Sequence, residues 1–525
     1  MMAKLGLKII VLLLLLTGAM SLSANPNAQS IEDLVKKAMQ TFQVPGVAIG
    51  IIKHGKIIHQ QGYGIANLDT GSPVDENTIF KIASNSKAFT AAALAILVDQ
   101  GKLNWDDKVI QYLPDFQMYD SWVTKEFNIL DLLTHRSGLR IGAGDLMLWP
   151  EPTKFSREEV VKNLRYLKPV TSFRNQYAYD NLLYIVAGEV IASISGQSWE
   201  AFIESNIFKP LGMENCFAGG VDTNKYLNLV TPHLVINNQL KVDHANLIND
   251  KISLMAAAGG IKCSASDLLK WLKMLLNGGI MDNGQSLISL SQRDFMWKAV
   301  TRLPLSSELK QLDNSHYRGY ALGWRVGDTH GEWKVSHTGS LSGSMSQIIM
   351  LPDHNLGIVV LTNQQSSAAR NSLARGLLQE FIEVNKTDWV AHYVKAKATR
   401  LSRLSKSTKK SAIISFPEEK LIPDNDKSRQ LLGNYIDPWF GEITLAKKNN
   451  NIIFQSKKSP RLKGTLYFYK DNQWWVKWHD RSFEADAWLY FNNNATRAKV
   501  RLLMKPISSA TDFSFDFEDL DFKQQ

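Results

Sequence analysis

The order of strand and helix patterns along the first 384 residues constrains the fold of this chain most strongly. Residues 47–67 alternate in the manner of two strands around a turn at His54 and Gly55. Segments with helical spacing of apolar residues follow, strand patterns return at 333–363, and a helical pattern closes the series at 368–384. This order predicts a mixed α/β fold, in which an antiparallel sheet is flanked by helices and carries an inserted helical subdomain.

The expected helices have apolar residues at three- and four-residue intervals. The first begins near Ser84 and ends before Gly101, a residue type that suits the end of a helix. The others are expected at 128–135, 181–195, 199–212 and 266–279.

The sequence changes character after residue 385. The segment 386–426 is basic and rich in Ser and Lys, and residues 427–525 show short strand patterns, Asn-rich turns and many aromatic residues. We therefore expect a mixed α/β domain at 28–385, a basic linker helix and loop at 386–426, and an all-β domain, either barrel or sandwich, at 427–525. Because apolar residues are sparse in the linker, a solvated charged face is favoured over a helix that binds membranes or polyanions.

The first 24 residues have the pattern of a secretory signal peptide. Lys4 and Lys8 precede an apolar run at 9–16, and small residues follow it. The run is too short for a spanning helix, although an uncleaved anchor is the alternative. No other segment approaches 18 apolar residues, so we expect a secreted or periplasmic protein with no integral membrane segment after removal of residues 1–24.

Charge and cysteine content limit the partners that the chain is expected to bind. The formal net charge is +10, but residues 386–410 contain eight Lys or Arg against one acid, and the leader carries two more lysines. The remainder is nearly neutral, so composition does not favour nucleic-acid binding. No metal or other cofactor is expected, because the 11 histidines form no metal-ligand spacing. Cys216 and Cys263 can form a disulfide or remain two buried thiols, and the sequence leaves both open.

The segment FKIASNSKAFT (80–90) contains a candidate nucleophile. A helix that begins near Ser84 places Lys87 one turn away on the same face, while Ser86 points elsewhere. A desolvated lysine can take the serine proton, and free N–H groups at the helix start can stabilise an oxyanion. The same Ser-x-x-Lys spacing occurs at 307–310 and 407–410, but only the first opens an apolar helix.

Several blocks in this chain resemble the penicillin-recognising serine hydrolases of the class C β-lactamase type. The blocks are VPGVAIGII, GYGIANLDTGSPVDENTIFKIASNSKAFT, LLTHRSGL, KPLGM, AAGGIKCSASDLL and YALGWRV, and together they span about 31–384. That superfamily also includes DD-peptidases, D-amino-acid amidases and esterases. Its Ser-x-x-Lys motif is followed by a Tyr-x-Asn motif and a Lys- or His-x-Gly strand motif. Tyr179-Asp180-Asn181 and His337-Thr338-Gly339 match these in the same order.

The resemblance implies roles for these residues. Ser84 would be the acylated nucleophile, and Lys87 with Tyr179 would activate it and move protons to the leaving group; which of the two is the base stays open. Asn181 would hold the substrate amide and the Lys87 ammonium. The backbone N–H groups of Ser84 and Ser340 would form the oxyanion hole, and the strand that carries the substrate-binding residues His337, Thr338, Gly339 and Ser340 would align the substrate.

One departure from the β-lactamase pattern bears on the substrate. The third motif has His337 where class C β-lactamases usually have a lysine, which resembles DD-peptidases, D-amino-acid amidases and esterases. We therefore expect an exported serine hydrolase that acts on an amide, peptide or ester as a D-amino-acid peptidase, a carboxylesterase or a weak β-lactamase. The alternative is a non-catalytic or stalled penicillin-binding receptor whose aromatic β domain binds a ligand.

The C-terminal β domain resembles the lipocalin-like appendage of some members of this superfamily. Its role as a lid, an oligomerisation surface or a pocket wall is open at the level of sequence. The sequence does not indicate an oligomeric state.

Overall fold

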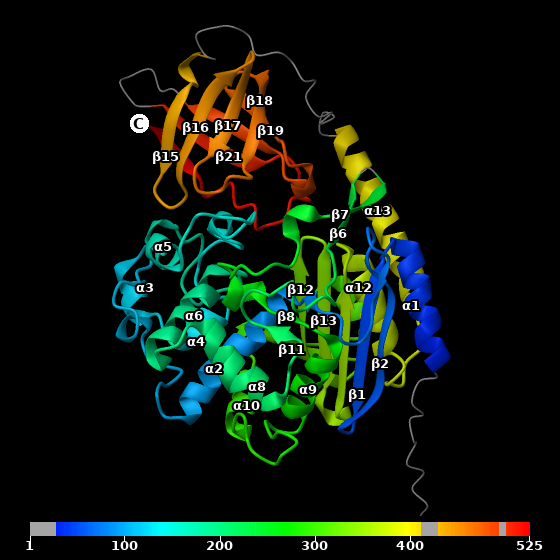
Figure 1. Ribbon diagram of the computed structural model, residues 1–525. Helices are drawn as coiled ribbons and strands as arrows, with labels where there is room; N and C mark the ends of the chain where they lie inside the picture. The colour runs from blue at the N-terminus through cyan, green and yellow to red at the C-terminus, as the bar shows by residue number, and fades with distance from the viewer. Residues whose placement is uncertain (1–27, 237, 411–428, 493–499) are drawn as a thin grey trace, which may run out of the picture.

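The computed structural model describes residues 28–236, 238–410, 429–492 and 500–525 (Figure 1). The predicted signal peptide, most of the loop that ends the linker, and the segment 493–499 lie outside the described residues. None of the described helices is both long enough and apolar enough to cross a membrane. The described residues also contain no group of three or more His, Cys, Asp or Glu side chains that could hold a metal ion.

The predicted antiparallel sheet is present and has nine strands. The two strands predicted at 47–67 are β1 (Gly46–Lys53) and β2 (Lys56–Asn67), which pair with each other, and β1 also pairs with β14 (Leu356–Thr362) from the far end of the domain. Every residue of β1 is buried. In spatial order the strands are β3 (Ser72–Pro73), β2 (Lys56–Asn67), β1 (Gly46–Lys53), β14 (Leu356–Thr362), β13 (Ser344–Leu351), β12 (Glu332–Leu341), β11 (Arg325–Thr329), β10 (Arg318–Tyr320) and β9 (Thr301–Arg302).

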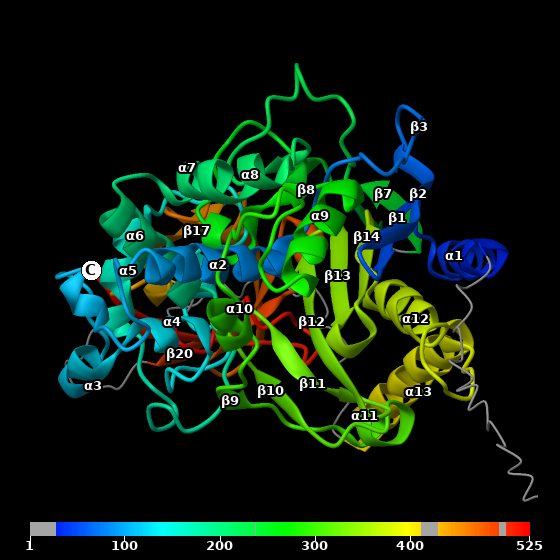
Figure 2. The ribbon, with the colours of Figure 1, turned by 90° about the horizontal axis from the view of Figure 1, so that it is seen from below.

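Helices cover both faces of this sheet, as Figures 1 and 2 show. On one face α12 (Ser367–Leu378) packs on β13 and β14, and α1 (Ala28–Phe42) and α13 (Trp389–Lys410) pack against α12. On the other face α9 (Ala265–Leu276) packs on β1 and β14. The helix α1 is an addition to the elements that the sequence predicts.

The inserted helical subdomain is present beside the sheet (Figure 2). The helix predicted from Ser84 begins with a 3-10 turn at Ala83–Asn85, which α2 continues. The segment predicted as one helix at 199–212 is divided, because a π-helical turn at Glu204–Phe208 separates α7 from α8. The helices of the subdomain are α2 (Ser86–Asp99), α3 (Ser121–Glu126), α4 (Ile129–Leu133), α5 (Arg157–Asn163), α6 (Leu182–Ser195), α7 (Trp199–Ile203), α8 (Lys209–Leu211) and α10 (Leu290–Met296). The helix α11 (Ser307–Leu312) lies apart from them, beside α13.

The C-terminal domain is a closed eight-stranded barrel rather than a sandwich. Alternate residues are buried in the strands Asn451–Ser456 and Arg501–Pro506, which is the period-two pattern of a strand with one face toward a core. Large side chains such as Trp474, Trp478 and Phe454 belong to this core, so the barrel interior is packed. The strands are β15 (Gly433–Asp437), β16 (Gly441–Lys448), β17 (Asn451–Ser456), β18 (Lys463–Lys470), β19 (Gln473–Trp478), β20 (Ala487–Asn492), β21 (Arg501–Pro506) and β22 (Asp521–Gln524).

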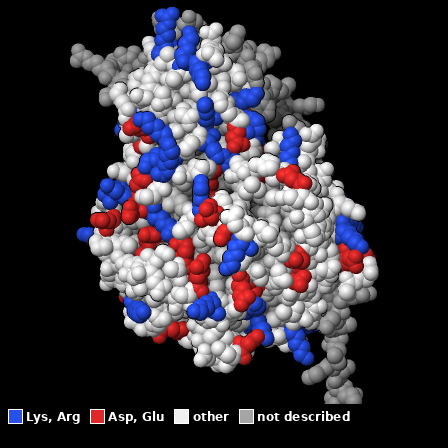
Figure 3. Space-filling model, in the orientation of Figure 1, with Lys and Arg blue, Asp and Glu red and all other residues white. Residues whose placement is uncertain are grey.

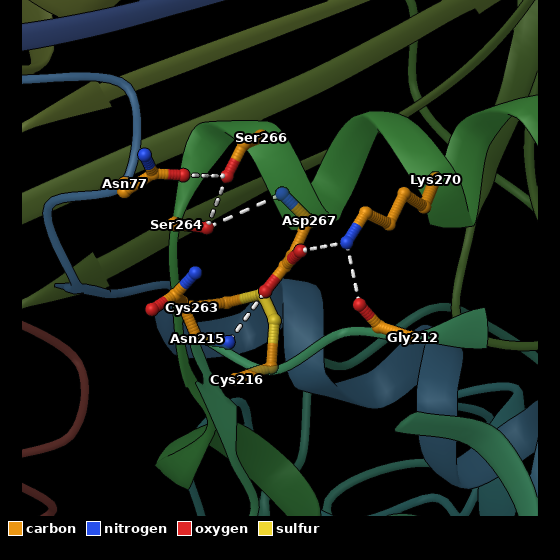
Figure 4. The surroundings of a disulfide bond; sticks show 9 residues. All are labelled: Asn77, Gly212, Asn215, Cys216, Cys263, Ser264, Ser266, Asp267 and Lys270. Carbon is orange, nitrogen blue, oxygen red and sulfur yellow. Dashed lines mark hydrogen bonds and ion pairs between the residues drawn. A yellow bond between two sulfur atoms is a disulfide. The ribbon is translucent and has the colours of Figure 1, made fainter. Parts of the chain in front are cut away.

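A small sheet of three strands supports the start of α2. Its central strand β8 (Lys262–Cys263) pairs with β4 (Phe80–Lys81) and with β5 (Cys216–Phe217). Cys216 and Cys263 face each other across β5 and β8 and form a disulfide (Figure 4), which decides between the two states that the sequence leaves open. Beside it, Asp267 accepts a hydrogen bond from the Asn215 N–H (2.6 Å) and forms an ion pair with Lys270 (2.7 Å).

The surface charge is mixed on the face that Figure 3 shows, where Lys and Arg are interspersed with Asp and Glu. Ion pairs account for some of this mixing in the molecule as a whole, for example Lys108 with Glu126 (2.9 Å).

Candidate active site

Ser84 lies in the 3-10 turn that precedes α2, directly beside β12. The preceding residue, Ala83, has a left-handed backbone with φ of 49°, an uncommon state for a residue other than glycine. The turn lies so close to the sheet that a Cβ on Gly339 would be 2.2 Å from the Ile82 carbonyl oxygen. The glycine of the third motif therefore permits the nucleophile and β12 to approach each other.

Lys87 is buried on the first turn of α2 and points back to Ser84. Its Nζ lies 3.3 Å from Ser84 Oγ and donates hydrogen bonds to Asn181 Oδ1 (2.7 Å) and to the Ala258 carbonyl (2.8 Å). Burial lowers the pKa of Lys87 to about 7, although the negative charge of Asp145 opposes this. A large share of Lys87 is therefore a neutral amine at neutral pH.

Tyr179 also contacts Ser84. Its hydroxyl donates a hydrogen bond to Ser84 Oγ (2.8 Å), and its ring packs against His135 with centroids 4.3 Å apart. Lys87 Nζ lies 4.7 Å from the ring centroid. Burial raises the pKa of Tyr179 above its ordinary value, so the phenol keeps its proton at neutral pH.

Ser86 is a structural residue, as its predicted direction implies. Its hydroxyl is buried, donates a hydrogen bond to the Ala83 carbonyl (2.7 Å) and accepts one from the Ile261 N–H (3.0 Å). The second serine of SNSK thus ties the 3-10 turn to the segment that leads into β8.

Asn181 is held by a carboxyl group that sequence reasoning did not identify. Its Nδ2 donates to Asp145 Oδ2 (2.8 Å), and the same oxygen accepts a hydrogen bond from Ser514 Oγ (2.9 Å) of the C-terminal domain. Burial raises the pKa of Asp145 to about 8, with the charge of Asp180 acting in the same direction. Asp145 follows GAG in the sequence, and no pattern there distinguishes it from an ordinary loop residue.

His337 is buried behind the site. Its Nε2 lies 3.0 Å from the Tyr320 hydroxyl and its Nδ1 lies 2.8 Å from the Thr338 carbonyl oxygen. Burial, together with the positive charge of Arg325, holds the pKa of His337 well below its ordinary value. The side chain is therefore neutral, and it cannot replace the fixed charge of the lysine found in class C β-lactamases.

Arg325 supplies the positive charge that His337 lacks. It begins β11, opposite Ser336 of β12, and its Nη1 donates to Thr338 Oγ1 (3.0 Å). Both Arg325 and Thr338 line the cavity above Ser84. Arg325 lies in the block YALGWRV. The sequence feature that could have identified it as a site residue is a basic residue at the start of the strand that precedes the third motif.

The cavity above Ser84 has a volume of about 330 Å³ and two walls. The α/β domain supplies Ser84, Tyr179, Asn181, Thr338 and Ser340, among others, so the structure brings together most of the predicted site residues. Gly339 lies beneath the 3-10 turn, and neither Lys87 nor His337 lines the cavity in the part of the chain that the structure describes.

The other wall comes from the C-terminal domain, which the sequence left without a role. The segment 507–520, between β21 and β22, brings Phe513 to the ring of Tyr179, with centroids 5.8 Å apart and nearly perpendicular planes. Nearby, Asp516 accepts a hydrogen bond from the Gly144 N–H (2.8 Å), and Arg140 pairs with Glu518 (2.8 Å). The barrel is thus a pocket wall.

Family models match both parts of the chain. The model described as Beta-lactamase matches residues 31–381. The model described as Domain of unknown function (DUF3471) matches residues 418–524.

Curated relatives are similar over much of the chain. It is 25% identical over 456 residues to Unguisins hydrolase ungD' of Aspergillus campestris (strain IBT 28561), an alignment that covers 83% of this chain and 81% of that protein. It is 28% identical over 354 residues to Protein flp of Staphylococcus aureus (strain MW2), covering 65% of this chain and 64% of that protein. The chain therefore spans less than two thirds of the length of Protein flp.

Solved structures share the fold. The octameric penicillin-binding protein homologue from Pyrococcus abyssi has a TM-score of 0.60 at 21% identity, covering 94% of this chain and 99% of that chain. A class C beta-lactamase has a TM-score of 0.55 at 24% identity, covering 68% of this chain and 97% of that chain. The first of these likenesses extends over the barrel as well as the α/β domain.

Proposed function

The chain belongs to the Beta-lactamase family, and from this premise we propose that it is a serine hydrolase that forms an acyl-enzyme at Ser84. One observation carries the proposal: Ser84 Oγ lies 3.3 Å from Lys87 Nζ and 2.8 Å from the Tyr179 hydroxyl. A nucleophile with a base and a proton donor in reach is the arrangement that acyl transfer needs.

We assign the general base to Lys87. Two of its hydrogen bonds go to oxygens that only accept, those of Asn181 and Ala258, and these use two N–H groups of a neutral amine. The remaining lone pair can then accept the proton of Ser84. A pKa of about 7 keeps a large share of Lys87 in this form, whereas the raised pKa of Tyr179 keeps the phenol protonated and unsuited to act as a base.

The proposed reaction has two halves. Ser84 Oγ attacks the carbonyl carbon while its proton passes to Lys87; the bond from carbon to the leaving nitrogen or oxygen then breaks, and Tyr179 relays a proton to that atom. Water hydrolyses the resulting ester. The backbone N–H groups of Ser84 and Ser340 are the proposed donors to the oxyanion, because the 3-10 turn and β12 adjoin at Gly339.

We propose that the preferred substrate is an amide, peptide or ester with a carboxylate on its leaving-group side. Arg325 and Thr338 lie together at the cavity, and a guanidinium beside a hydroxyl is suited to bind a carboxylate. A D-amino-acid peptidase with a free carboxyl terminus fits this site, as does a carboxylesterase whose substrate bears an acid group. The similarity to Unguisins hydrolase ungD' supports hydrolysis over a purely binding role.

We also propose that the protein acts in an oxidising compartment, secreted or periplasmic. The disulfide between Cys216 and Cys263 supports this, because such bonds persist mainly outside the cytosol. The leader-like pattern of residues 1–24 points the same way. Mass spectrometry of the protein recovered from the export compartment tests it, since it reads both the N-terminus and the state of the cysteines.

Intact-mass spectrometry after incubation with a fluorescent penicillin and with a fluorophosphonate tests the nucleophile. The wild type should gain one adduct, Ser84→Ala should gain none, and Ser307→Ala, in the second Ser-x-x-Lys string, should behave as the wild type does. Labelling of Ser84→Ala, or no labelling of the wild type by either probe, would refute the assignment. An adduct that persists without turnover of any ester or peptide would instead support the stalled receptor.

Paired peptides test the substrate class. A peptide ending in D-Ala-D-Ala with a free carboxylate should be cleaved with a kcat/KM at least about tenfold above that of its C-terminal amide, since one charge-assisted hydrogen bond typically contributes that much. Arg325→Gln should abolish this preference while leaving the amide substrate nearly unchanged. Equal rates for both peptides in the wild type would exclude Arg325 as the carboxylate-binding residue. Nitrocefin and p-nitrophenyl esters then rank the remaining classes.

A further inference from the structure

A second cavity lies on the other side of Arg325 from the catalytic pocket. Its volume is about 310 Å³, and residues of the strands β10 to β13 and of the helices α11, α12 and α13 line it. Figure 2 shows these three helices together on one side of the sheet. Five basic residues line it: Arg318, Arg325, Lys334, Arg370 and Arg375. Arg325 and Thr338 line both cavities, so the two adjoin.

The acidic residues of this cavity do not balance its positive charges. Asp313 is the partner of both Arg375 (2.8 Å) and Lys334 (3.8 Å). The other acidic residue, Asp328, is engaged elsewhere, since it accepts hydrogen bonds from the N–H groups of His316 (2.8 Å) and Tyr317 (2.9 Å). Two carboxylates, Asp313 and Asp328, therefore face the five cations among the described residues, and an excess of positive charge remains.

The other three basic side chains form hydrogen bonds only with neutral groups, or form none. Arg325 donates to the hydroxyl of Thr338, as described above. Arg370 Nη1 donates to the Gly339 carbonyl and to Ser340 Oγ, both at 3.2 Å. Arg318 forms no hydrogen bond or ion pair with its side chain within the described ranges, although it lines the cavity. Three guanidinium groups thus form no ion pair among the described residues, and Asp313 acts on Arg318 only through its charge.

The arrangement is electrostatically costly for the empty protein. Burial lowers the pKa of Lys334 to about 8, with Arg375 and Arg318 adding to the effect, and burial together with Arg325 lowers the pKa of Arg370 to about 10. Buried charges are ordinarily paired, and an anion placed among these groups would relieve their mutual repulsion. Guanidinium groups also bind oxyanions through paired N–H donors.

We propose that this cavity binds a small oxyanion with two negative charges, such as a phosphate or dicarboxylate group. The volume accommodates such a group together with water molecules. The site goes beyond the proposed hydrolase activity. Because it joins the catalytic pocket at Arg325, the anion has two possible sources: an extension of the leaving group of the substrate, or a free ion that binds beside it.

Calorimetric titration of the full chain with inorganic phosphate, against sodium chloride at equal ionic strength, tests the binding. Arg318→Gln and Lys334→Met should each weaken phosphate binding about tenfold, which corresponds to about 1.4 kcal/mol. The matched control is Arg302→Gln, an exposed arginine on the neighbouring strand β9, which should bind phosphate as the wild type does. Circular dichroism shows which variants are folded, and either cavity variant suffices for the test.

Two results would overturn the proposal: phosphate giving no more heat than chloride, or both cavity variants binding phosphate with the wild-type affinity. The titration does not depend on catalysis, so it stands even if Ser84 proves not to be the nucleophile. The kinetics of acylation by penicillin, measured with and without added phosphate, distinguish the two sources of the anion. If added phosphate raises KM and leaves kcat unchanged, the anion site is the place of a substrate group. If phosphate binds but leaves both constants unchanged, the site holds a separate ion.

Discussion

The two walls of the catalytic cavity are built in different ways. The wall from the α/β domain brings together Ser84 in a 3-10 turn, Tyr179 and Asn181 just before α6, and Thr338 on β12, and the Tyr179 hydroxyl donates a hydrogen bond to Ser84 (2.8 Å). The wall from the barrel comes from the irregular segment 507–520 and from Ser482 and Phe483, which add aromatic rings and hydroxyl groups to the same cavity. Under the proposed function, the α/β domain supplies the reacting groups, and the barrel wall contacts the substrate.

From this difference we expect the α/β domain to determine reactivity and the barrel wall to determine substrate selectivity. Groups that must hold a shifted pKa require burial and fixed partners, which packed helices and strands provide. A loop on a separate domain can vary in shape without disturbing those groups. Asp145 is the point where the two walls meet, since it binds both Asn181 and Ser514.

The largest expected effect is in the α/β domain, at Lys87 behind the first wall. Lys87→Met should lower the acylation rate by about 10³-fold, because the base that takes the proton of Ser84 is removed. Stopped-flow acylation by a chromogenic ester measures it, with Lys310→Met on exposed α11 as the control. In the wild type, kcat/KM should rise with pH through about 7, as Lys87 loses its proton. A profile that is flat between pH 6 and 8, or a variant at the wild-type rate, would contradict the assignment.

Asp145 should show an intermediate effect, because it positions Asn181 without touching the substrate carbonyl. Asp145→Asn should lower kcat/KM by about 100-fold, since small displacements of catalytic groups have effects of this size. The folded protein keeps the Asp145 proton up to about pH 8, whereas the unfolded chain loses it near pH 4.

The contribution of Asp145 to stability therefore falls as pH rises between those values. The asparagine variant should lose this part of the pH dependence of Tm. If Tm of the two proteins changed in parallel from pH 4 to 8, Asp145 would not carry the raised pKa.

A smaller effect is expected on the barrel wall. Phe513→Ala should raise KM about tenfold for substrates with a large acyl or leaving group and change kcat little, because it removes apolar contact area but no reacting group. Steady-state kinetics with esters of increasing size measure this, and the smallest ester serves as the internal control. A fall in kcat for every ester would mean that the barrel wall takes part in the chemistry, which would end the distinction between the two walls.

The disulfide should have the smallest effect on activity. The variant with both Cys216 and Cys263 replaced by Ala should lose about 3–4 kcal/mol of unfolding free energy, as expected when a cross-link across 47 residues is removed. Its kcat/KM at 25 °C should match that of the wild type, because neither sulfur lines the cavity. Chemical denaturation with and without reductant measures the change. Lost activity at full folding would show that β8 positions Lys87 through the Ala258 carbonyl.

The amino-acid sequence by itself determined the local pairings. Ser84 and Lys87 meet because helical geometry places residues three apart on one face, and Ser86 turns away for the same reason. The strands around His337 follow from alternation, and the order of the motifs placed them in one fold.

Only the tertiary structure decided what surrounds those residues. Ser514 reaches Asp145 across 369 residues of sequence, and Arg325 reaches the cavity only through the pairing of β11 with β12. Such contacts depend on how the barrel packs against the α/β domain and on strand register. The local spacing of apolar residues in the sequence specifies neither of these. For this physical reason the candidate nucleophile Ser84 is readable from eleven residues, whereas Arg325 and the barrel wall beside it are not.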